Sequence, residues 1–493
     1  MNNTNLTPRE ISSLVKKLPY FEIQGQNEKI TSLACDSANV ETGGLFFCLP
    51  GMKTDGHAFA AEAAEAGARA LVVERFLPLP VTQILVGDAR SAMAVMAGSF
   101  YGSPIEKMRL IGVTGTNGKT TTTYILREIA KAAGIETGLI GTTCNKIGDT
   151  ELPAHMTTPD PIELHALFAD MLSRGVQWVI TEVSAHAIDL RKMDGTRADA
   201  AVFTNLSQDH LDYFQTLERY KEVKKSYFTP EYCKRAVVNA DDPAGREIIG
   251  AARVPVTTYG CENPSDVFAV NFETGVTGLK YVINLFDDIY DIKFRLSGRY
   301  NMYNTLAAAA AAHVLGAGVK DVVKGIGALK SVPGRFNTLQ ARPFSIVVDF
   351  AHTPEGIANV CKCAREFTKG KLIVVFGCGG NRDKTKRPLM GKAAGASADY
   401  AVLTSDNPRF EPPFDIMRQA ERGLQETSCR YIAIENRREA IAHALKTARK
   451  NDAVLILGKG DENYQDICGV KYPFSDADVV YELLGLKAEV GNK

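Results

Sequence analysis

Residues 110–134, LIGVTGTNGKTTTTYILREIAKAAG, combine an apolar strand, a glycine-rich turn and the start of a helix. Backbone N–H groups at Gly115 and Gly118 can approach phosphate oxygens, and the helix N-terminus adds its positive end. In such a loop the Lys119 ammonium reaches the terminal phosphates, and the Thr120 hydroxyl binds Mg²⁺. The usual GxxxxGK[ST] spacing would need its first glycine two residues before Gly115. A ligand-free turn does not explain three glycines beside Lys-Thr-Thr, so we predict a nucleotide site.

A second candidate site is SDNPRF at 405–410, which directly follows the apolar run 400–404. Asp, Asn and Pro are common turn residues, so this stretch alone is compatible with a plain turn. Four other apolar runs in the last third of the chain also end in polar sequence: DFAHTP, GCGGNRDK, ENRRE and GKGDE. Polar ends of five parallel strands at one edge make a binding site. We therefore predict that Asp406, Asn407 and Arg409 bind a ligand.

Two further segments could support nucleotide chemistry. Glu182 follows the strand-like run 178–181, so its carboxylate is expected beside the phosphate loop, where it could share a Mg²⁺ with Thr120. In SQDHLDYF, His210 lies between two aspartates. Without further information this pattern indicates a loop histidine held by neighbouring carboxylates.

Lys224 lies in YKEVKKSYF, residues 220–228. Tyr220, Lys224 and Phe228 recur every four residues, so the lysine shares one helical face with two aromatic rings, whereas Lys225 points elsewhere. An apolar setting lowers the pKa of a lysine and frees its amine. We predict a buried, reactive amine at position 224.

The elements that position these residues indicate an α/β protein. Expected strands in the last third span 346–349, 372–376, 400–403, 431–434 and 454–457, with helix-length stretches between them. This alternation predicts βαβ units and a parallel sheet. With 493 residues the chain is too long for one core. We predict three domains: a small N-terminal α/β domain over 1–88, a central P-loop parallel-sheet domain over 89–334, and a C-terminal Rossmann-like α/β domain over 335–493.

Bulk composition excludes several classes of protein. Lys+Arg and Asp+Glu both number 57, so no overall field would attract nucleic acid or a membrane surface. The N-terminal sequence lacks the apolar core of a signal peptide, and no apolar run approaches the ~20 residues of a membrane span. Ten cysteines show no framework spacing and no CxxC pair. We expect a cytoplasmic protein with reduced thiols.

The pattern TGTNGKTT resembles the Mur ligase family, ATP-dependent enzymes that add amino acids to the peptidoglycan precursor. The resemblance covers nearly the whole chain, and the ordered set of motifs is more specific than any one of them. Besides GCGGNRDKTKRPLMG, the matching segments are EVSAHAIDLRKMDG (182–195), FTNLSQDHLDYF (203–214), VVNADD (237–242), GRYNMYN (298–304), VPGRF (332–336) and DFAHTP (349–354).

The resemblance implies a reaction. ATP, with Mg²⁺, phosphorylates the D-glutamate γ-carboxylate of UDP-N-acetylmuramoyl-L-alanyl-D-glutamate, and the amine of meso-2,6-diaminopimelate attacks the acyl phosphate. The first segment, DSANVETGGLFFCLPGMKTDG (36–56), is similar to the family's uridine-binding domain, with the 52–54 turn near the uracil. We expect a monomer that neither binds nucleic acid nor inserts into a membrane.

The same resemblance assigns site residues by their positions in the motifs. Catalytic roles fall to Lys119, Glu182, His210 and Lys224. The residues assigned to ATP are Gly115, Thr116, Asn117, Gly118, Lys119, Thr120, Thr121, Asn304, Arg335 and Asp349. Those assigned to the UDP-substrate are Ser37, Thr157, Thr158, Ser184 and Lys192. Those assigned to diaminopimelate are Arg382, Asp406, Asn407, Arg409, Gly458 and Glu462. The metal ligands are Thr120, Glu182, His210 and Lys224, the last as a carbamate.

Four positions depart from the family's usual residues. Ala38 and Lys192 stand where arginine is more common, and lysine keeps the charge but loses the two-pronged geometry. Asn381 and Asp461 replace the more common aspartate and histidine. None of the four is the expected carboxylate clamp, so the substrate assignment stands as an expectation.

Three alternatives remain. A lysine-adding member of the family is disfavoured because the planar fork of Arg409 matches the distal carboxylate of diaminopimelate, which lysine lacks. A folylpolyglutamate synthetase shares the P-loop and fold, but should lack the 36–56 pattern and DNPR. A catalytically silent nucleotide-binding scaffold is disfavoured by the intact set of catalytic residues.

Overall fold

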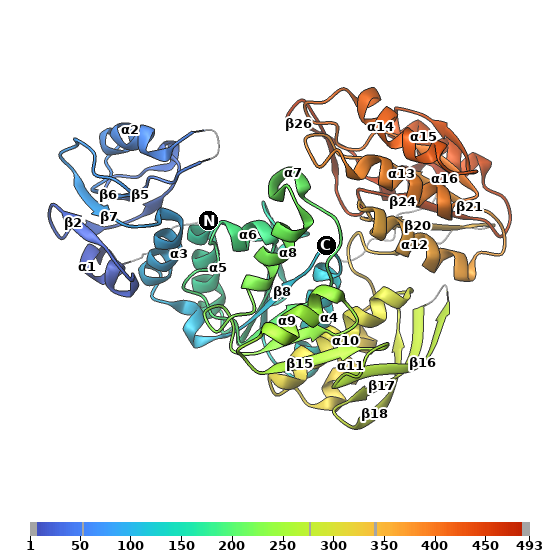
Figure 1. The fold of residues 1–493 in the computed structure, drawn as a ribbon, viewed down its shortest axis with the longest axis horizontal. Coiled ribbons are helices and arrows are strands. Elements are labelled where there is room, and N and C mark those ends of the chain that lie inside the picture. Colours follow the sequence, from blue (N-terminus) through green and yellow to red (C-terminus); the bar gives the residue numbers. More distant parts are fainter. Residues whose placement is uncertain (1–6, 52–53, 276–277, 340–342, 486–493) are drawn as a thin grey trace.

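The structure is a computed structural model that describes residues 7–51, 54–275, 278–339 and 343–485. Three large sheets follow one another along the chain, from the blue N-terminal part through the green and yellow middle to the orange and red C-terminal part (Figure 1), besides two two-stranded sheets. Each sheet is covered by helices, and each strand-rich segment contributes its own hydrophobic core. The 52–54 turn predicted near the uracil includes residues 52 and 53, which lie outside the described residues.

The N-terminal sheet has the order β2-β7-β6-β5-β4, and only β2 is antiparallel to its neighbour. Its strands are β2 (Glu22–Gln24), β4 (Leu33–Ala34), β5 (Leu45–Phe47), β6 (Ala70–Val73) and β7 (Thr82–Leu85). Helix α3 (Ala89–Phe100) buries Met93 and Met96 in the same core as Phe47 and Val72. The predicted domain boundary at 88/89 falls at the start of this helix and stays a prediction.

The central sheet has eleven strands in the order β11-β10-β9-β12-β8-β13-β14-β15-β16-β17-β18. Its parallel centre comprises β9 (Thr137–Ile140), β12 (Trp178–Glu182), β8 (Arg109–Thr114), β13 (Ala200–Phe203), β14 (Ala236–Asn239) and β15 (Val256–Gly260). Antiparallel β10 (Asn145–Ile147) and β11 (Thr150–Leu152) extend one edge, and β16 (Val267–Gly275), β17 (Gly278–Leu285) and β18 (Asp288–Phe294) extend the other. Strand β16 runs parallel to β15, and the other added strands pair antiparallel with their neighbours. The sequence analysis did not predict these extensions.

Helices on the central sheet carry several site residues. They include α4 (Lys119–Ala132), α5 (Pro161–Ser173), α6 (Ala185–Asp189), α7 (Leu211–Phe214), α8 (Leu217–Ser226), α9 (Pro243–Ala251), α10 (Arg299–Val314) and α11 (Val319–Ala328). The alanines at 307–312 in α10 are fully buried, because small side chains let this helix pack closely on the sheet and on α4. Close packing there holds Asn304 against the phosphate loop.

The C-terminal sheet has the order β19-β20-β24-β21-β22-β23, and every pair except β19–β20 is parallel. Its strands are β19 (Asn337–Leu339), β20 (Ser345–Asp349), β21 (Leu372–Phe376), β22 (Tyr400–Leu403), β23 (Arg430–Ala433) and β24 (Ala453–Leu457). The five predicted strands are confirmed to within one residue at each end. Their carboxyl ends, with the polar sequences that follow them, therefore lie along one edge.

Helices α12 (Pro354–Phe367), α13 (Lys386–Ser397), α14 (Pro413–Gln425), α15 (Arg437–Thr447) and α16 (Asp476–Leu484) cover the two faces of this sheet (Figure 1). A hairpin of β25 (Tyr464–Ile467) and β26 (Val470–Pro473) lies beside the segment that follows β22, through a bridge between Arg409 and Ile467. All ten cysteines carry free thiols. Within the described residues, no helix is both long and apolar enough to cross a membrane.

Candidate active site

A cavity of about 800 Å³ lies where the central sheet faces the carboxyl edge of the C-terminal sheet. Most of the predicted site residues line it, although they come from all parts of the chain beyond residue 115. These are Thr116, Asn117, Gly118, Lys119, Thr120, Thr121, Thr157, Glu182, Ser184, His210, Asn304, Arg335, Asp349, Arg382, Asp406, Asn407, Arg409, Gly458 and Glu462. Five predicted residues do not line it: Ser37, Gly115, Thr158, Lys192 and Lys224.

The phosphate loop is held by two close approaches that only glycine permits. Gly115 has φ +147°, and a Cβ there would lie 1.9 Å from the Thr204 hydroxyl. Gly118, at φ +86°, would place a Cβ 2.3 Å from the side-chain oxygen of Asn304. Thr204, which directly follows β13, donates to the Asn117 carbonyl at 2.6 Å. Thr204 and Asn304 of α10 therefore both pack against the loop. The loop's backbone is thereby fixed before any phosphate arrives.

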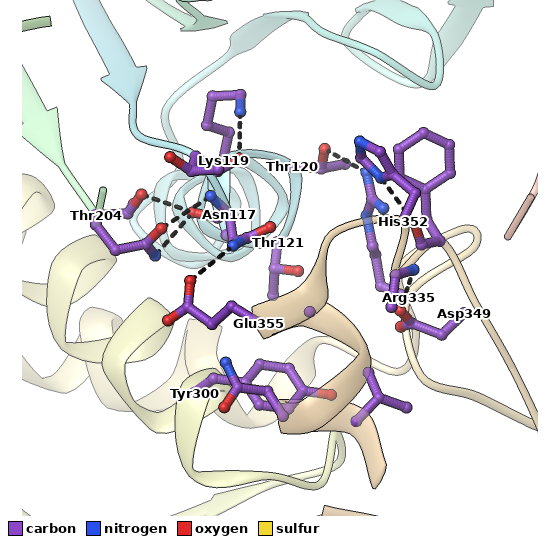
Figure 2. A pocket seen from close by; sticks show the side chains of 18 of the residues that line it. Asn117, Lys119, Thr120, Thr121, Thr204, Tyr300, Arg335, Asp349, His352 and Glu355 are labelled. Carbon is purple, nitrogen blue, oxygen red and sulfur yellow. Dashed lines mark hydrogen bonds between the residues drawn. The ribbon is translucent and has the colours of Figure 1, made fainter. Parts of the chain in front are cut away.

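Cations from two segments flank the start of α4 (Figure 2). The Lys119 ammonium donates to the carbonyls of Gly115 and Thr116, both at 2.9 Å. Arg335 reaches from the hinge segment to donate to the Thr120 hydroxyl at 3.1 Å, and its guanidinium stacks 4.4 Å from the Phe350 ring centre. Burial lowers the pKa of Lys119, and the nearby Arg335 adds to this, against Glu182 and Asp209. Two cations beside a glycine loop make a site for a polyanion.

Asp349 and Asn304 also make hydrogen bonds that stabilise their own segments, which their motifs do not indicate. The Asp349 carboxylate accepts from the Phe336 N–H at 2.6 Å and from the Ala351 N–H at 2.7 Å. Burial raises its pKa despite Arg335 and these donors. The Asn304 amide donates to Asn301 at 3.1 Å. Both side chains line the cavity, but each also fixes its own segment.

Glu182 and His210 face the cavity, Glu182 from the end of β12 and His210 from the residue before α7. Glu182 ends β12, which pairs in parallel with β8, and its carboxylate accepts from the Thr142 N–H at 3.0 Å and from the Thr142 hydroxyl at 2.9 Å. His210 has a left-handed backbone, φ +57°. Its ring lies 3.5 Å from Asp209, and partial burial lowers its pKa despite that carboxylate. A neutral imidazole and a carboxylate are thus presented on the same side of the cavity.

Lys224 is almost fully buried on α8, as its helical spacing predicts. Its ammonium nitrogen lies 4.8 Å from the Tyr220 ring centre and makes one long contact, 3.5 Å, to the Thr114 hydroxyl. Burial, with help from Lys119, lowers its pKa well below the ordinary value. By contrast, Lys225 forms ion pairs with Glu222 at 2.8 Å and Glu247 at 3.0 Å. Burial, without an ion-pair partner among the described residues, therefore favours the neutral amine of Lys224.

The other end of the cavity carries two adjacent guanidinium groups. Arg409 donates to the Gly380 carbonyl at 2.7 Å, its side chain is 21% exposed, and the Asp466 carboxylate lies 3.8 Å away. Arg382 is an exposed residue that lines the same cavity. Partial loss of hydration lowers its pKa, and the positive charge of Arg409 lowers it further. This concentration of positive charge favours an anionic group between the two side chains.

Acidic and amide groups lie next to the two arginines. Asn407 donates to Glu462 at 2.8 Å, and Lys459 donates to both side chains. Asp406 is buried, yet Lys459 and Arg437 hold its pKa below the ordinary value against the effect of burial. Gly458, at φ +118°, would place a Cβ 2.6 Å from the Asp406 carboxylate, so only glycine lets that carboxylate approach. Anionic and cationic groups together match a ligand with both charges.

Three protein-family models match segments of this chain. The family model described as the Mur ligase middle domain matches residues 113–312, the glutamate ligase domain of Mur ligases matches 334–460, and the Mur ligase catalytic domain matches 29–101. A curated protein of Geobacillus thermodenitrificans, named UDP-N-acetylmuramoyl-L-alanyl-D-glutamate--2,6-diaminopimelate ligase, is 43% identical over 95% of this chain and 98% of its own. The chain belongs to the Mur ligase family.

Other Mur ligases match this chain over comparable lengths. A protein of the same name from Caldanaerobacter subterraneus is 42% identical over 94% of this chain and 96% of its own. A solved structure of a UDP-N-acetylmuramoyl-L-alanyl-D-glutamate--2,6-diaminopimelate ligase superimposes with a TM-score of 0.69 at 32% identity, covering 96% of this chain and 98% of that one. The expected family and α/β fold class are therefore confirmed.

The predicted acceptor residues of this Mur ligase fall into two groups. Thr157 and Ser184 line the cavity. Thr158 is buried behind them and donates to the Glu182 carbonyl at 2.9 Å. Lys192 is also buried, and its ammonium pairs with Asp160 at 2.8 Å. Ser37 begins a short 3₁₀ turn of the N-terminal segment, outside the cavity.

One contact of this Mur ligase site escaped the sequence analysis. Asp209, beside His210, accepts from Lys386 of α13 at 2.9 Å, and both side chains are buried. His352 lies 3.6 Å from the same carboxylate. Burial raises the pKa of Asp209, but His352 and Lys386 hold it well below the ordinary value. The quoted motifs contain all these residues, yet only the folded chain brings them together.

Proposed function

We propose that the chain is an ATP-dependent ligase that adds meso-2,6-diaminopimelate to UDP-N-acetylmuramoyl-L-alanyl-D-glutamate. One observation carries the choice of amino acid: Arg409 and Arg382 lie side by side in the cavity that also contains Lys119. Diaminopimelate carries a carboxylate at its far end, and lysine does not. A site that leaves a buried donor unpaired rejects the wrong substrate strongly, by about 10⁴-fold at well-built sites. The names of the relatives support the same substrate pair.

The proposed reaction has two steps. The γ-phosphoryl group of ATP passes to the D-glutamate γ-carboxylate, which gives an acyl phosphate and ADP. The diaminopimelate amine then forms a bond to the acyl carbon, and inorganic phosphate leaves with the electrons of the broken C–O bond. Gly115, Gly118 and Lys119 would bind and orient the phosphates, and Arg335 would neutralise charge on them. The protein acts mainly by positioning and charge neutralisation.

Mg²⁺ would fit this site in the manner usual for phosphate-transfer enzymes. Among the described residues, no three His, Cys, Asp or Glu side chains come close enough together to hold a metal ion on their own. Mg²⁺ is commonly held by one or two protein oxygens together with substrate phosphates, and Thr120 and Glu182 offer a hydroxyl and a carboxylate at the phosphate loop. When bound, the ion would reduce the repulsion between the two anions that react. His210 and the carbamate of Lys224 are proposed ligands of a second ion.

The proposed division of labour follows the three predicted domains. Residues 1–88 would bind the uridine part of the substrate, with Ser37 toward the uracil. Residues 89–334 would bind ATP, and Thr157, Thr158, Ser184 and Lys192 would bind the acceptor's sugar and peptide. Residues 335–493 would bind the amino acid through Asp406, Asn407, Gly458 and Glu462, besides the two arginines. The ADP complexes named among structural neighbours below 25% identity support only the shared fold.

One experiment tests the proposal. Purified protein is given ATP, Mg²⁺ and the UDP-dipeptide, and ADP release is followed with meso-diaminopimelate or L-lysine as the second substrate. We expect rapid release and a UDP-tripeptide product with diaminopimelate alone. Equal use of lysine would contradict the role of Arg409, and no product with either amino acid would favour a silent nucleotide-binding scaffold.

A further inference from the structure

The two arginines of the cavity stand on two loops that lie side by side. The loop after β21 carries Arg382, and the loop after β22 carries Arg409. Gly380 joins them in both directions: its N–H donates to the Asn407 carbonyl at 2.8 Å, and its carbonyl accepts from Arg409 at 2.7 Å. A Cβ at position 380 would lie 1.9 Å from the Pro408 carbonyl oxygen. The distance between the two guanidinium groups therefore depends on how these loops are held together.

Each loop contains a residue in an unfavourable backbone conformation. Asn381 has φ +49° and Arg409 has φ +51°, in the left-handed region. For a residue other than glycine this region costs about 1–2 kcal/mol, although asparagine tolerates it better than most. Such a conformation persists only where the surroundings hold it. Arg409 is held by the β25–β26 hairpin, through the Asp466 carbonyl at 2.9 Å and the Cys468 N–H at 2.8 Å.

A buried ion pair supplies the corresponding support on the other side. Arg387 on α13 has a side chain that is 1% exposed, and it binds both carboxylate oxygens of Glu411, at 2.8 and 3.0 Å. The same guanidinium donates to the Gly379 carbonyl at 3.1 Å. Glu411 in turn accepts from the Asn381 N–H, and the Asn381 side chain accepts from the Phe410 N–H at 3.0 Å. One ion pair thus connects the loop of Arg382 with the loop of Arg409.

We propose that Glu411 and Arg387 are positioning residues that set the choice of amino acid by holding Arg409 and Arg382 at a fixed separation. The inference rests on the proposed function, because it concerns the site for the distal carboxylate of diaminopimelate. Neither residue lines the cavity, so the pair acts only through the two loops. The two guanidinium groups repel each other, and without an anchor the loops would move apart. Keeping them together in advance lowers the cost of binding the carboxylate.

The test compares the steady-state kinetics of the full-length wild type and variant with each of the two amino acids. Glu411→Gln keeps the size of the side chain but removes its charge and half of the two-pronged contact. We expect kcat/KM for diaminopimelate to fall about 10- to 30-fold, mainly through KM, since one charge-assisted contact is lost. The KM values for ATP and for the UDP-dipeptide should stay the same, and so should the low kcat/KM with lysine. The ratio of diaminopimelate to lysine therefore falls.

A matched control variant distinguishes an effect on the positions of the two arginine loops from a general loss of stability. Glu426→Gln removes a carboxylate that pairs with Lys392 at 2.9 Å, and this exposed pair also joins the segments of α13 and α14, away from the two loops. We expect this variant to keep the diaminopimelate-to-lysine ratio of the wild type. Glu411→Asp, which retains the charge on a shorter side chain, should recover part of the ratio.

A second variant decides the question if Glu411→Gln does not fold. Asn381→Gly suits the left-handed backbone but removes the bond to the Phe410 N–H, and it leaves no buried charge unpaired. We expect the diaminopimelate-to-lysine ratio to fall about fivefold through loss of one hydrogen bond. A wild-type protein that already accepts both amino acids equally would overturn the proposed function. A selective wild type whose ratio survives in both variants would overturn only the positioning role of Glu411 and Arg387.

Discussion

The phosphate loop and the two arginine loops line one cavity but are held in place in different ways. The phosphate loop is a single short segment, 115–121, and Thr204 and Asn304 pack against its glycines at 115 and 118. The arginine end is built from side chains that follow separate strands, and a buried ion pair joins two of the loops. Close packing against glycine backbone therefore fixes the nucleotide end, whereas the amino-acid end depends on a side-chain ion pair between two loops. We expect loss of a side chain that does not line the cavity to disturb the amino-acid end more than the nucleotide end.

The largest effect should come from the nucleotide end. Lys119→Ala removes the ammonium predicted to contact the terminal phosphates, and ADP release should fall about 1,000-fold, as when one preorganised charge-stabilising donor is lost. The fold should survive, because Lys119 donates only to carbonyls of its own loop. Lys131→Ala is the control, since this lysine lies in the last turn of the same helix and pairs with exposed Asp149. Full activity of the Lys119→Ala protein would contradict the proposed contact between this ammonium and the terminal phosphates.

At the amino-acid end, Arg409→Ala should act on one substrate only. We expect kcat/KM for diaminopimelate to fall about 100- to 1,000-fold, because the distal carboxylate loses its two-pronged partner. The low activity with lysine should stay the same or rise, since a repelling cation is removed. Steady-state kinetics with both amino acids measure this. Arg418→Ala on α14, where the guanidinium stacks 4.8 Å from the Phe414 ring, is the control. Equal losses with both amino acids would point to misfolding of the loop.

Lys224 is buried beside Thr114, the last residue of β8, and its replacement should have an intermediate effect. Lys224→Ala should lower turnover about 100-fold, the scale seen when one group of a metal environment is removed. If the lysine carries a carbamate, added formate or acetate should restore part of the activity. Lys225→Ala is the control, because its ammonium pairs with Glu222 and Glu247 instead of facing the phosphate loop. Full activity of Lys224→Ala without added carboxylate would reject the carbamate.

The same comparison explains what the sequence could and could not predict. The glycine loop, the strand ends and the packing of Lys224 against Tyr220 are local patterns, and each appears in the fold where it was expected, although α8 ends before Phe228. The pairs Arg387–Glu411 and Lys386–Asp209 join residues 24 and 177 positions apart, and no periodicity indicates them. The strands β16–β18 form two consecutive hairpins and were missed because only some of their side chains are buried, so apolar and polar residues are mixed along each strand. The role of Lys192 toward substrate stays a prediction, and its ion pair with Asp160 is a further contact that depends on packing the sequence does not reveal.

The smallest effect should appear as a pH dependence of stability. The two-pronged bond from Arg387 lowers the pKa of Glu411 from 4.5 to about 2. Because the folded protein then holds the proton less tightly than the unfolded chain, the pair stabilises the fold fully above pH 4.5, and this contribution is lost as the pH falls toward 2. Denaturant unfolding of wild type and Glu411→Gln should differ by a pH-dependent part of at most about 3 kcal/mol over this range.

The control for this last prediction is Gln419, which contacts the same arginine. Gln419 accepts from the Arg387 guanidinium at 3.0 Å but does not titrate, so Gln419→Ala should lower stability by the same amount at every pH. A Glu411→Gln curve that ran parallel to that of the wild type between pH 4.5 and 2 would mean that the ion pair contributes no net stability. In that case the two arginine loops would have to be held by the β25–β26 hairpin and Gly380 alone, and the amino-acid end would resemble the phosphate loop in depending on backbone contacts.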